Sequence, residues 1–81
     1  MALIKVKIKI YGIVQGVFFR VSAVDKANEL GIACEPKNMP DNTIEIVVEG
    51  NEENVSRFTE WCKTGPNLAK VEKIEVIHET D

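Results

Sequence analysis

The sequence has little cysteine and no excess of positive charge, and each shortage excludes a class of protein. Its two cysteines, Cys34 and Cys62, are too few for a disulfide framework and lack the paired spacing of a zinc site. We expect both thiols to be reduced and partly buried, and a single Cys34–Cys62 bridge is the alternative. The formal charge of −3 disfavours a nucleic-acid partner, since nucleic-acid-binding domains gather Lys and Arg on one basic face.

Long apolar runs are also missing. No stretch approaches the roughly 20 apolar residues that cross a bilayer, and the first residues alternate lysines with aliphatics instead of forming the apolar block of a signal peptide. The sequence therefore predicts a soluble, cytoplasmic protein with no membrane partner. Its 81 residues fit a single domain, 1–81, without linker or repeat, and we expect a monomer.

What the sequence does contain is six segments with the periodicity of regular structure. Aliphatic residues that alternate with charged ones indicate half-buried strands, and apolar residues spaced three or four apart indicate helices. In chain order, the segments are a strand at 3–11, a helix at 20–30, a short edge strand at 32–38, a strand at 43–49, a helix at 52–62 and a strand at 71–78, followed by frayed residues 79–81. The side chains expected to point inward are Ile4, Val6, Ile8, Ile10, Ala23, Ala27, Leu30, Ile44, Ile46, Val48, Val55, Phe58, Trp61, Cys62, Ile74 and Val76.

Glycine, proline and asparagine residues support these boundaries. Gly31 stops the first helix and Gly65-Pro66 the second. Pro36 removes a ladder donor, which confines its segment to the edge of a sheet. Residues 39–42, Met-Pro-Asp-Asn, predict a tight turn between two antiparallel strands, in which Asn42 takes the left-handed conformation.

The order βαββαβ with right-handed crossovers predicts an α+β fold. It is the ferredoxin-like two-layer sandwich, an antiparallel four-stranded sheet with two helices on one face. This fold serves many purposes, so function depends on a site. An RNA-binding version needs aromatic side chains on the central strands, and a metal carrier needs a cysteine pair in the first loop. The two central strands carry only one aromatic residue, Tyr11, at an end, and the first loop contains no cysteine, so both versions are disfavoured and the residues favour an anion site.

The stretch YGIVQGVFFR, residues 11–20, has the composition of such a site. Gly12 and Gly16 allow positive φ and close backbone approach, and successive amides in such a loop converge on an anion. A helix start adds unpaired N–H groups and a favourable dipole. Arg20 supplies the planar fork that matches phosphate oxygens.

These residues closely resemble the first signature of the acylphosphatase family, and the resemblance covers almost the whole chain. Glu49-Gly50 and Gly65-Pro66 also fall at places similar to those in the family. The matching positions of the first motif are Gly12, Val14, Gln15, Gly16, Val17, Phe19 and Arg20, and those of a second motif are Lys37, Asn38, Pro40 and Asp41.

The resemblance implies a hydrolase that cleaves the carboxyl–phosphate bond of acyl phosphates to carboxylate and phosphate, with no metal or cofactor. By that resemblance Arg20 and Asn38 are catalytic: Arg20 binds the phosphoryl group and Asn38 orients the attacking water. The implied phosphate-binding loop is Gln15, Gly16, Val17, Phe18, Phe19 and Arg20. The chemistry is consistent, because a departing carboxylate with a pKa of about 4 needs no general acid.

Other residues have plainer interpretations. Cys34-Glu35-Pro36 departs from the family's usual glycine, aromatic and small apolar residues, so the alternative function is a catalytically weak anion-binding or regulatory domain of the same fold. Gln15 is expected to close the loop by hydrogen bonding rather than to catalyse, and His78 to lie at the surface. Lysines 5, 7 and 9 are expected on the solvent face of the sheet, paired with Glu45 or Glu49.

Overall fold

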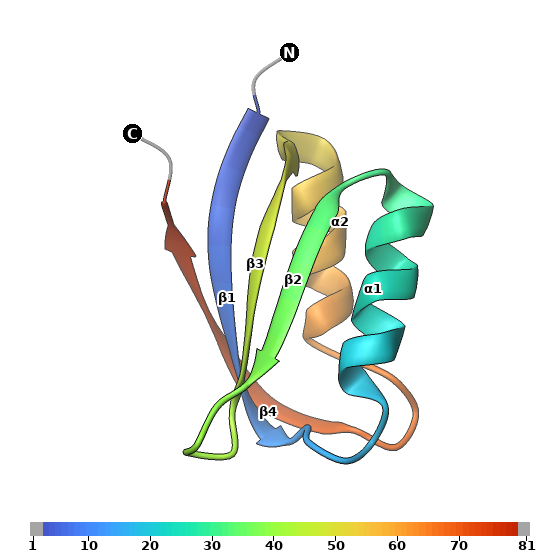
Figure 1. The fold of residues 1–81 in the computed structure, drawn as a ribbon, viewed down its shortest axis with the longest axis vertical. Coiled ribbons are helices and arrows are strands. Elements are labelled where there is room, and N and C mark those ends of the chain that lie inside the picture. Colours follow the sequence, from blue (N-terminus) through green and yellow to red (C-terminus); the bar gives the residue numbers. More distant parts are fainter. Residues whose placement is uncertain (1–2, 80–81) are drawn as a thin grey trace.

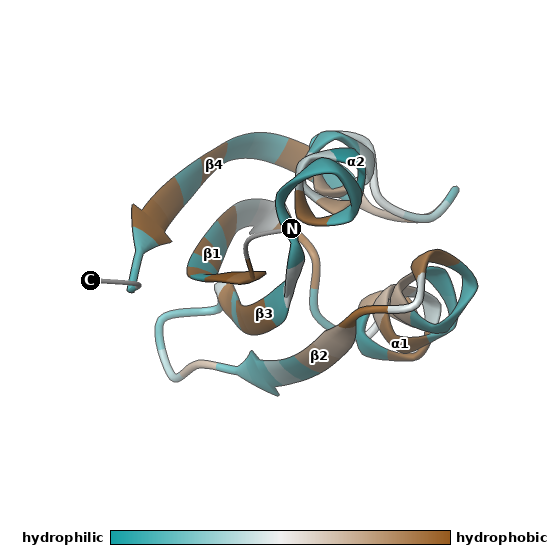
Figure 2. Ribbon diagram, turned by 90° about the horizontal axis from the view of Figure 1, so that it is seen from above, coloured by the Kyte–Doolittle hydropathy of each residue, from teal (hydrophilic) through white to brown (hydrophobic). Residues whose placement is uncertain are grey.

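Four strands and two helices follow one another along the chain in the predicted order βαββαβ. The computed structural model describes residues 3–79. The elements are β1 (Leu3–Ile13), α1 (Phe19–Leu30), β2 (Ala33–Asn38), β3 (Ile44–Asn51), α2 (Glu52–Cys62) and β4 (Lys70–His78). The strands form one antiparallel sheet in the order β2-β3-β1-β4, and both helices lie on the same side of it (Figures 1 and 2). The predicted ferredoxin-like sandwich is confirmed.

The core lies between this sheet and the helices. In the β1–β3 ladder the residue pairs Val6↔Val48, Ile8↔Ile46 and Ile10↔Ile44 place buried aliphatics opposite one another. Such cross-strand pairs stabilise a sheet, and they fix its register because a slip of one residue would expose them all. The helices contribute six further buried side chains, which are Phe19, Ala23, Ala27, Val55, Phe58 and Cys62. The connecting segments add three more: Val14, Ile32 and Thr43.

The central strand β1 is longer than expected. It continues to Ile13, two residues beyond the predicted end, and a bulge between Tyr11 and Gly12 shifts its register against β4. Gly12 has φ 128, and a Cβ there would lie 2.1 Å from the Lys70 carbonyl oxygen. Only glycine allows this approach, so the sequence of the first motif directs where β1 leaves the sheet.

The prediction for the end of the chain is wrong at two points. Ile74 is half-buried as expected, but Val76 is 39% exposed, because the helices pack mainly on β1, β2 and β3 and leave this end of β4 uncovered. Residue 79 is not frayed, since the Glu79 amide donates to the Lys5 carbonyl at 2.9 Å and so extends the ladder. Residues 80–81 lie outside the described residues.

Both cysteines are free thiols, as the sequence predicts, so the alternative bridge does not form. Cys62 is fully buried at the end of α2, and Cys34 is half-buried on β2. Burial raises the pKa of the Cys34 thiol to about 11 and that of Cys62 further still. Neither thiol is therefore primed for nucleophilic chemistry at neutral pH.

Candidate anion site

The loop between β1 and α1 has the backbone of an anion cradle. Gly16 and Phe18 have φ values of 73° and 61°, while Val17 between them does not have positive φ. Alternation of this kind turns successive amide N–H groups toward one side of the chain. Phe18 is also the N-cap of α1, although its side chain cannot accept a hydrogen bond and makes none. A bulky residue in a left-handed N-cap position is strained, which is typical of functional sites.

Helix α1 begins at Phe19, one residue before the predicted start. Its first main-chain bond runs from the Ser22 amide to the Phe18 carbonyl at 3.0 Å. The amides of residues 19–21 therefore have no partner within the helix, which is the arrangement that binds anions at helix N-termini. Arg20 lies in this first turn, so its side chain starts where the free amides are.

Packing beneath the loop fixes the start of α1. Phe19 is 1% exposed, and its ring lies 5.5 Å from the ring of Trp61. A Cβ on Gly65 would lie 2.5 Å from the Phe19 ring, so the glycine that follows α2 leaves the space that Phe19 fills. The cradle is thus held by the end of α2 as well as by its own sequence.

The side chain of Gln15 joins the cradle to the β2–β3 turn. Its Nε2 donates to the Met39 carbonyl and to the Thr43 carbonyl, each at 2.9 Å. The expectation that Gln15 closes the loop by hydrogen bonding is confirmed. Because Met39 directly follows Asn38, this bridge sets the distance between the loop and the residue predicted to hold the water.

The β2–β3 turn is stiffened in turn by Asp41. Its carboxylate accepts from both the amide and the hydroxyl of Thr43 and forms an ion pair with Lys9 at 3.2 Å. The hydrogen bonds from Thr43 are the main reason that the pKa of Asp41 falls to about 2. Asn42 has φ 71, the left-handed conformation expected of it.

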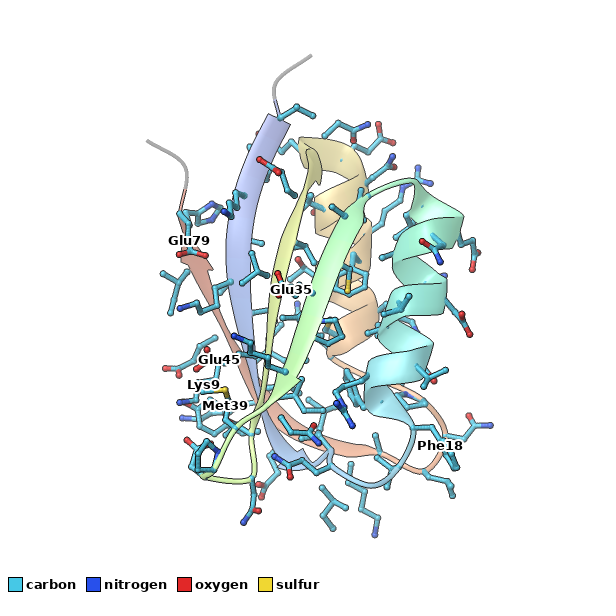
Figure 3. All side chains as sticks on the ribbon, viewed as in Figure 1. Lys9, Phe18, Glu35, Met39, Glu45 and Glu79 are labelled. Carbon is cyan, nitrogen blue, oxygen red and sulfur yellow. The ribbon has the colours of Figure 1, made fainter. Side chains whose placement is uncertain are left out.

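Charged groups on the open face of the sheet continue from this turn. The Nζ of Lys9 also lies 4.0 Å from Glu45, as does that of Lys7, so the expected lysine–glutamate pairing is confirmed for Glu45. Figure 3 shows Lys9, Glu45 and Met39 together at the turn end of the sheet. His78 is exposed, as expected of a surface residue.

The two predicted catalytic residues lie on one cavity of about 600 Å³. Arg20 comes from the first turn of α1 and Asn38 from the last position of β2, where it pairs with Ile44 of β3. Both side chains are exposed, and neither makes a hydrogen bond or ion pair with any of residues 3–79. From the predicted phosphate-binding loop, Gly16, Phe18, Phe19 and Arg20 line the cavity, whereas Gln15 and Val17 do not.

Six further residues of the cavity wall are not among the predicted site residues: Val14, Val21, Val24, Asp25, Pro36 and Ile44. Val24 lies four residues after Arg20 on α1, so helical spacing from Arg20 could have found it, whereas Val21 and Asp25 are four residues from each other and not from Arg20. Pro36 lines the cavity without interrupting the β2–β3 ladder, which runs from Ala33 to Asn38. Glu35 pairs with Val47 and is exposed on the other face, away from the cavity.

The fold and cavity define a ferredoxin-like domain with an arginine and free amides at one end. The acylphosphatase family model matches residues 6–81. An acylphosphatase from Methylococcus capsulatus is 43% identical over 72 residues, which is 89% of this chain and 78% of that protein. Acylphosphatase structures from Coxiella burnetii and Bacillus subtilis both give a TM-score of 0.91, at 32% and 34% identity. They match 96% and 99% of this chain and 82% and 88% of their own.

The chain therefore belongs to the acylphosphatase family, as its two motifs indicate. Within residues 3–79 no three His, Cys, Asp or Glu side chains are grouped so that they could hold a metal ion. Across the same residues no helix has the length and apolar character needed to span a membrane.

Proposed function

We propose that this member of the acylphosphatase family hydrolyses the carboxyl–phosphate bond of acyl phosphates, with Arg20 and the loop amides holding the phosphoryl group and Asn38 positioning the attacking water. One observation carries the proposal. Two polar side chains without partners in residues 3–79, Arg20 and Asn38, lie on the same cavity at the free-amide end of α1. The names of the relatives support the same activity.

The cradle suits the charge of the transferred group. The guanidinium of Arg20 can form two parallel hydrogen bonds with phosphoryl oxygens, and the amides of residues 15–20 and the helix dipole add fixed positive charge. Phosphoryl transfer spreads charge over the three equatorial oxygens of a loose transition state. Groups that are already oriented stabilise that charge without reorganising, and such stabilisation accounts for most of the rate enhancement in many enzymes.

Asn38 has the complementary task. Its side-chain carbonyl would accept a hydrogen bond from a water and aim the water oxygen at phosphorus, opposite the leaving carboxylate. A new P–O bond then forms while the bond from phosphorus to the acyl oxygen breaks, and its electron pair leaves with the carboxylate. The water's proton passes to solvent or to a phosphate oxygen. A loose transition state needs little base catalysis, so a positioning amide suffices.

The remaining features belong to the same proposal. The activity needs no metal or cofactor, because the leaving carboxylate requires no Lewis acid. We further propose that the protein is a monomer in the cytoplasm, without nucleic-acid or membrane partners. Arg20 and Asn38 come from one chain, so the site needs no second copy, and two free thiols fit a reducing compartment.

The test measures phosphate release from a simple acyl phosphate with no metal added. We expect Arg20→Ala to lower kcat/KM by at least about a hundredfold and to abolish inhibition by inorganic phosphate. Arg57→Ala is the matched control, because Arg57 is exposed on α2, outside the cavity wall, and pairs with Glu53 at 2.9 Å. It should leave turnover unchanged.

Asn38→Ala should lower kcat while inhibition by phosphate stays nearly intact, and Asn28→Ala, an exposed asparagine of α1, is its control. Equal losses of turnover and phosphate inhibition in Asn38→Ala would overturn the water-positioning role. If the wild-type protein binds phosphate but releases none above the spontaneous rate, the enzyme proposal fails and the anion-binding alternative takes its place.

A further inference from the structure

The cavity extends beyond the anion cradle along one face of α1. Arg20 and Val24 are four residues apart, as are Val21 and Asp25, and all four side chains line the wall. Residues spaced three and four apart are neighbours on a helix surface. Asp25 lies five residues beyond Arg20, which is a rise of about 7.5 Å along the axis. In the function proposed above, the phosphoryl group occupies only the Arg20 end of this wall.

The middle of the wall is apolar. Phe18, Val21 and Val24 are 71%, 62% and 38% exposed, and Pro36 of β2 lines the same cavity. Figure 3 shows the Phe18 side chain pointing away from the body at the base of α1. Burying exposed apolar area is favourable, so this strip suits an apolar or aromatic acyl group attached to the phosphoryl group.

A carboxylate, that of Asp25, lies at the far end of this strip. The side chain of Asp25 makes no hydrogen bond or ion pair with residues 3–79, and the neighbouring lysine, Lys26, pairs with Glu29 at 3.6 Å. Among the described residues that line the cavity, Arg20 and Asp25 are the only charged ones. The two ends of the cavity therefore carry opposite charges, with apolar side chains between them.

We propose that Asp25 selects substrates by the charge of their acyl group. It disfavours acyl phosphates that carry a second anionic group at the far end of the acyl chain, and it favours neutral aromatic or aliphatic ones and those with a cationic end. The proposal rests on the function proposed above and adds to it the class of substrate. Asp25 is a specificity residue here, since it is too far from the phosphoryl group to act on the bond that breaks.

The experiment uses three rigid substrates that differ only at the para position. They are benzoyl phosphate, 4-carboxybenzoyl phosphate and 4-(trimethylammonio)benzoyl phosphate, and the ring carries each substituent along the strip toward Asp25. Because the substituents also alter the intrinsic reactivity of the phosphate, each kcat/KM of Asp25→Asn is divided by the wild-type value for the same substrate. Glu29→Gln is the matched control, one turn further along α1, outside the cavity wall and with the same change in net charge.

For Asp25→Asn we expect kcat/KM to rise about threefold with the carboxylate substrate and to fall about threefold with the ammonium substrate, as solvent-exposed charge pairs allow. The value for benzoyl phosphate should change less than about twofold, and both effects should shrink in high salt. Asp25→Lys should shift the carboxylate and ammonium ratios in the same directions as Asp25→Asn does, and further. Glu29→Gln should change none of the three ratios.

The proposal is overturned if Asp25→Asn changes all three substrates by one common factor, or if Glu29→Gln shifts the ratios as much. Failure of the proposed function is distinct, because wild-type protein would then hydrolyse none of the three. In that case the phosphonates with CH₂ in place of the bridging oxygen decide the question by calorimetry. Tighter binding of the ammonium than of the carboxylate analogue, lost in Asp25→Asn, supports the selection, and equal binding refutes it.

Discussion

Replacing Gln15 by alanine tests how the two halves of the site are held together. The side chain makes two hydrogen bonds across the gap between the cradle and the β2–β3 turn, both at 2.9 Å and both partly buried. At about 1 kcal/mol net for each bond, Gln15→Ala should lower the free energy of unfolding by about 2 kcal/mol. For a domain of this size that corresponds to a fall in Tm of about 8–16 °C.

The kinetic effect should exceed what lost stability explains. Without the bridge the Met39 carbonyl keeps only its bond from the Asn42 amide, at 3.1 Å within the turn, so the Gln15 bonds no longer tie the turn to the cradle. Asn38 beside Met39 can then drift from the cradle. We expect kcat to fall on the order of tenfold, since positioning errors of an ångström are costly, while the inhibition constant for phosphate changes less than about threefold. Assays are run well below the lowered Tm, with circular dichroism showing that the variant is folded.

The structure offers a matched control in Asn54. Its side-chain amide also donates to a distant backbone carbonyl, that of Leu30 at 3.0 Å, but at the other end of the helices. Asn54→Ala should cost about 1 kcal/mol of stability and leave kcat unchanged. A folded Gln15→Ala protein with wild-type kcat would refute the positioning argument, and wild-type stability would refute the bridge itself.

Three further predictions concern the surroundings of the site. Gly12→Ala should destabilise the fold by at least about 3 kcal/mol in urea unfolding, because its Cβ would meet the Lys70 carbonyl at a φ that side chains rarely adopt. The pKa of Asp41 is lowered to about 2, so its stabilising effect is present above pH 4 and lost as the pH falls toward 2. Acid unfolding of Asp41→Asn should accordingly show a weaker pH dependence than wild type in that window. Burial raises the pKa of Cys34 to about 11, so a disulfide reagent should label it slowly at pH 7 and faster in denaturant.

Much of the fold follows from the sequence because its signals are local and agree with one another. Alternation defines β1 and β3, and Asn42 takes the left-handed turn conformation for which asparagine is suited. The expectation for Val76 failed because alternation shows which face a residue is on but not whether a helix covers that face. Whether a residue of β4 is covered depends on where α2 lies across the sheet, and the sequence of β4 itself does not indicate that position.

Part of the candidate site was also predictable, because some of its signals are local in the sequence. The glycines and Arg20 are adjacent in sequence, so the cradle is visible as a motif. The two hydrogen-bond partners of Gln15 are not visible in the motif, because they lie more than 20 positions further along the chain. Phe18 is predicted within the loop, but its left-handed N-cap position contradicts its own propensity, so no local signal predicts that conformation.

The pairing of β1 with β4 has a consequence for synthesis. The strand that leads into the cradle is encoded first, yet the bulge at Gly12 is defined by pairing with residues 70–73, which a ribosome adds nearly sixty residues later. A nascent chain that holds the whole loop motif but has not reached β4 would lack the partner that directs β1 toward α1. We therefore expect phosphate binding to appear late in translation, together with the last strand, rather than when the loop emerges.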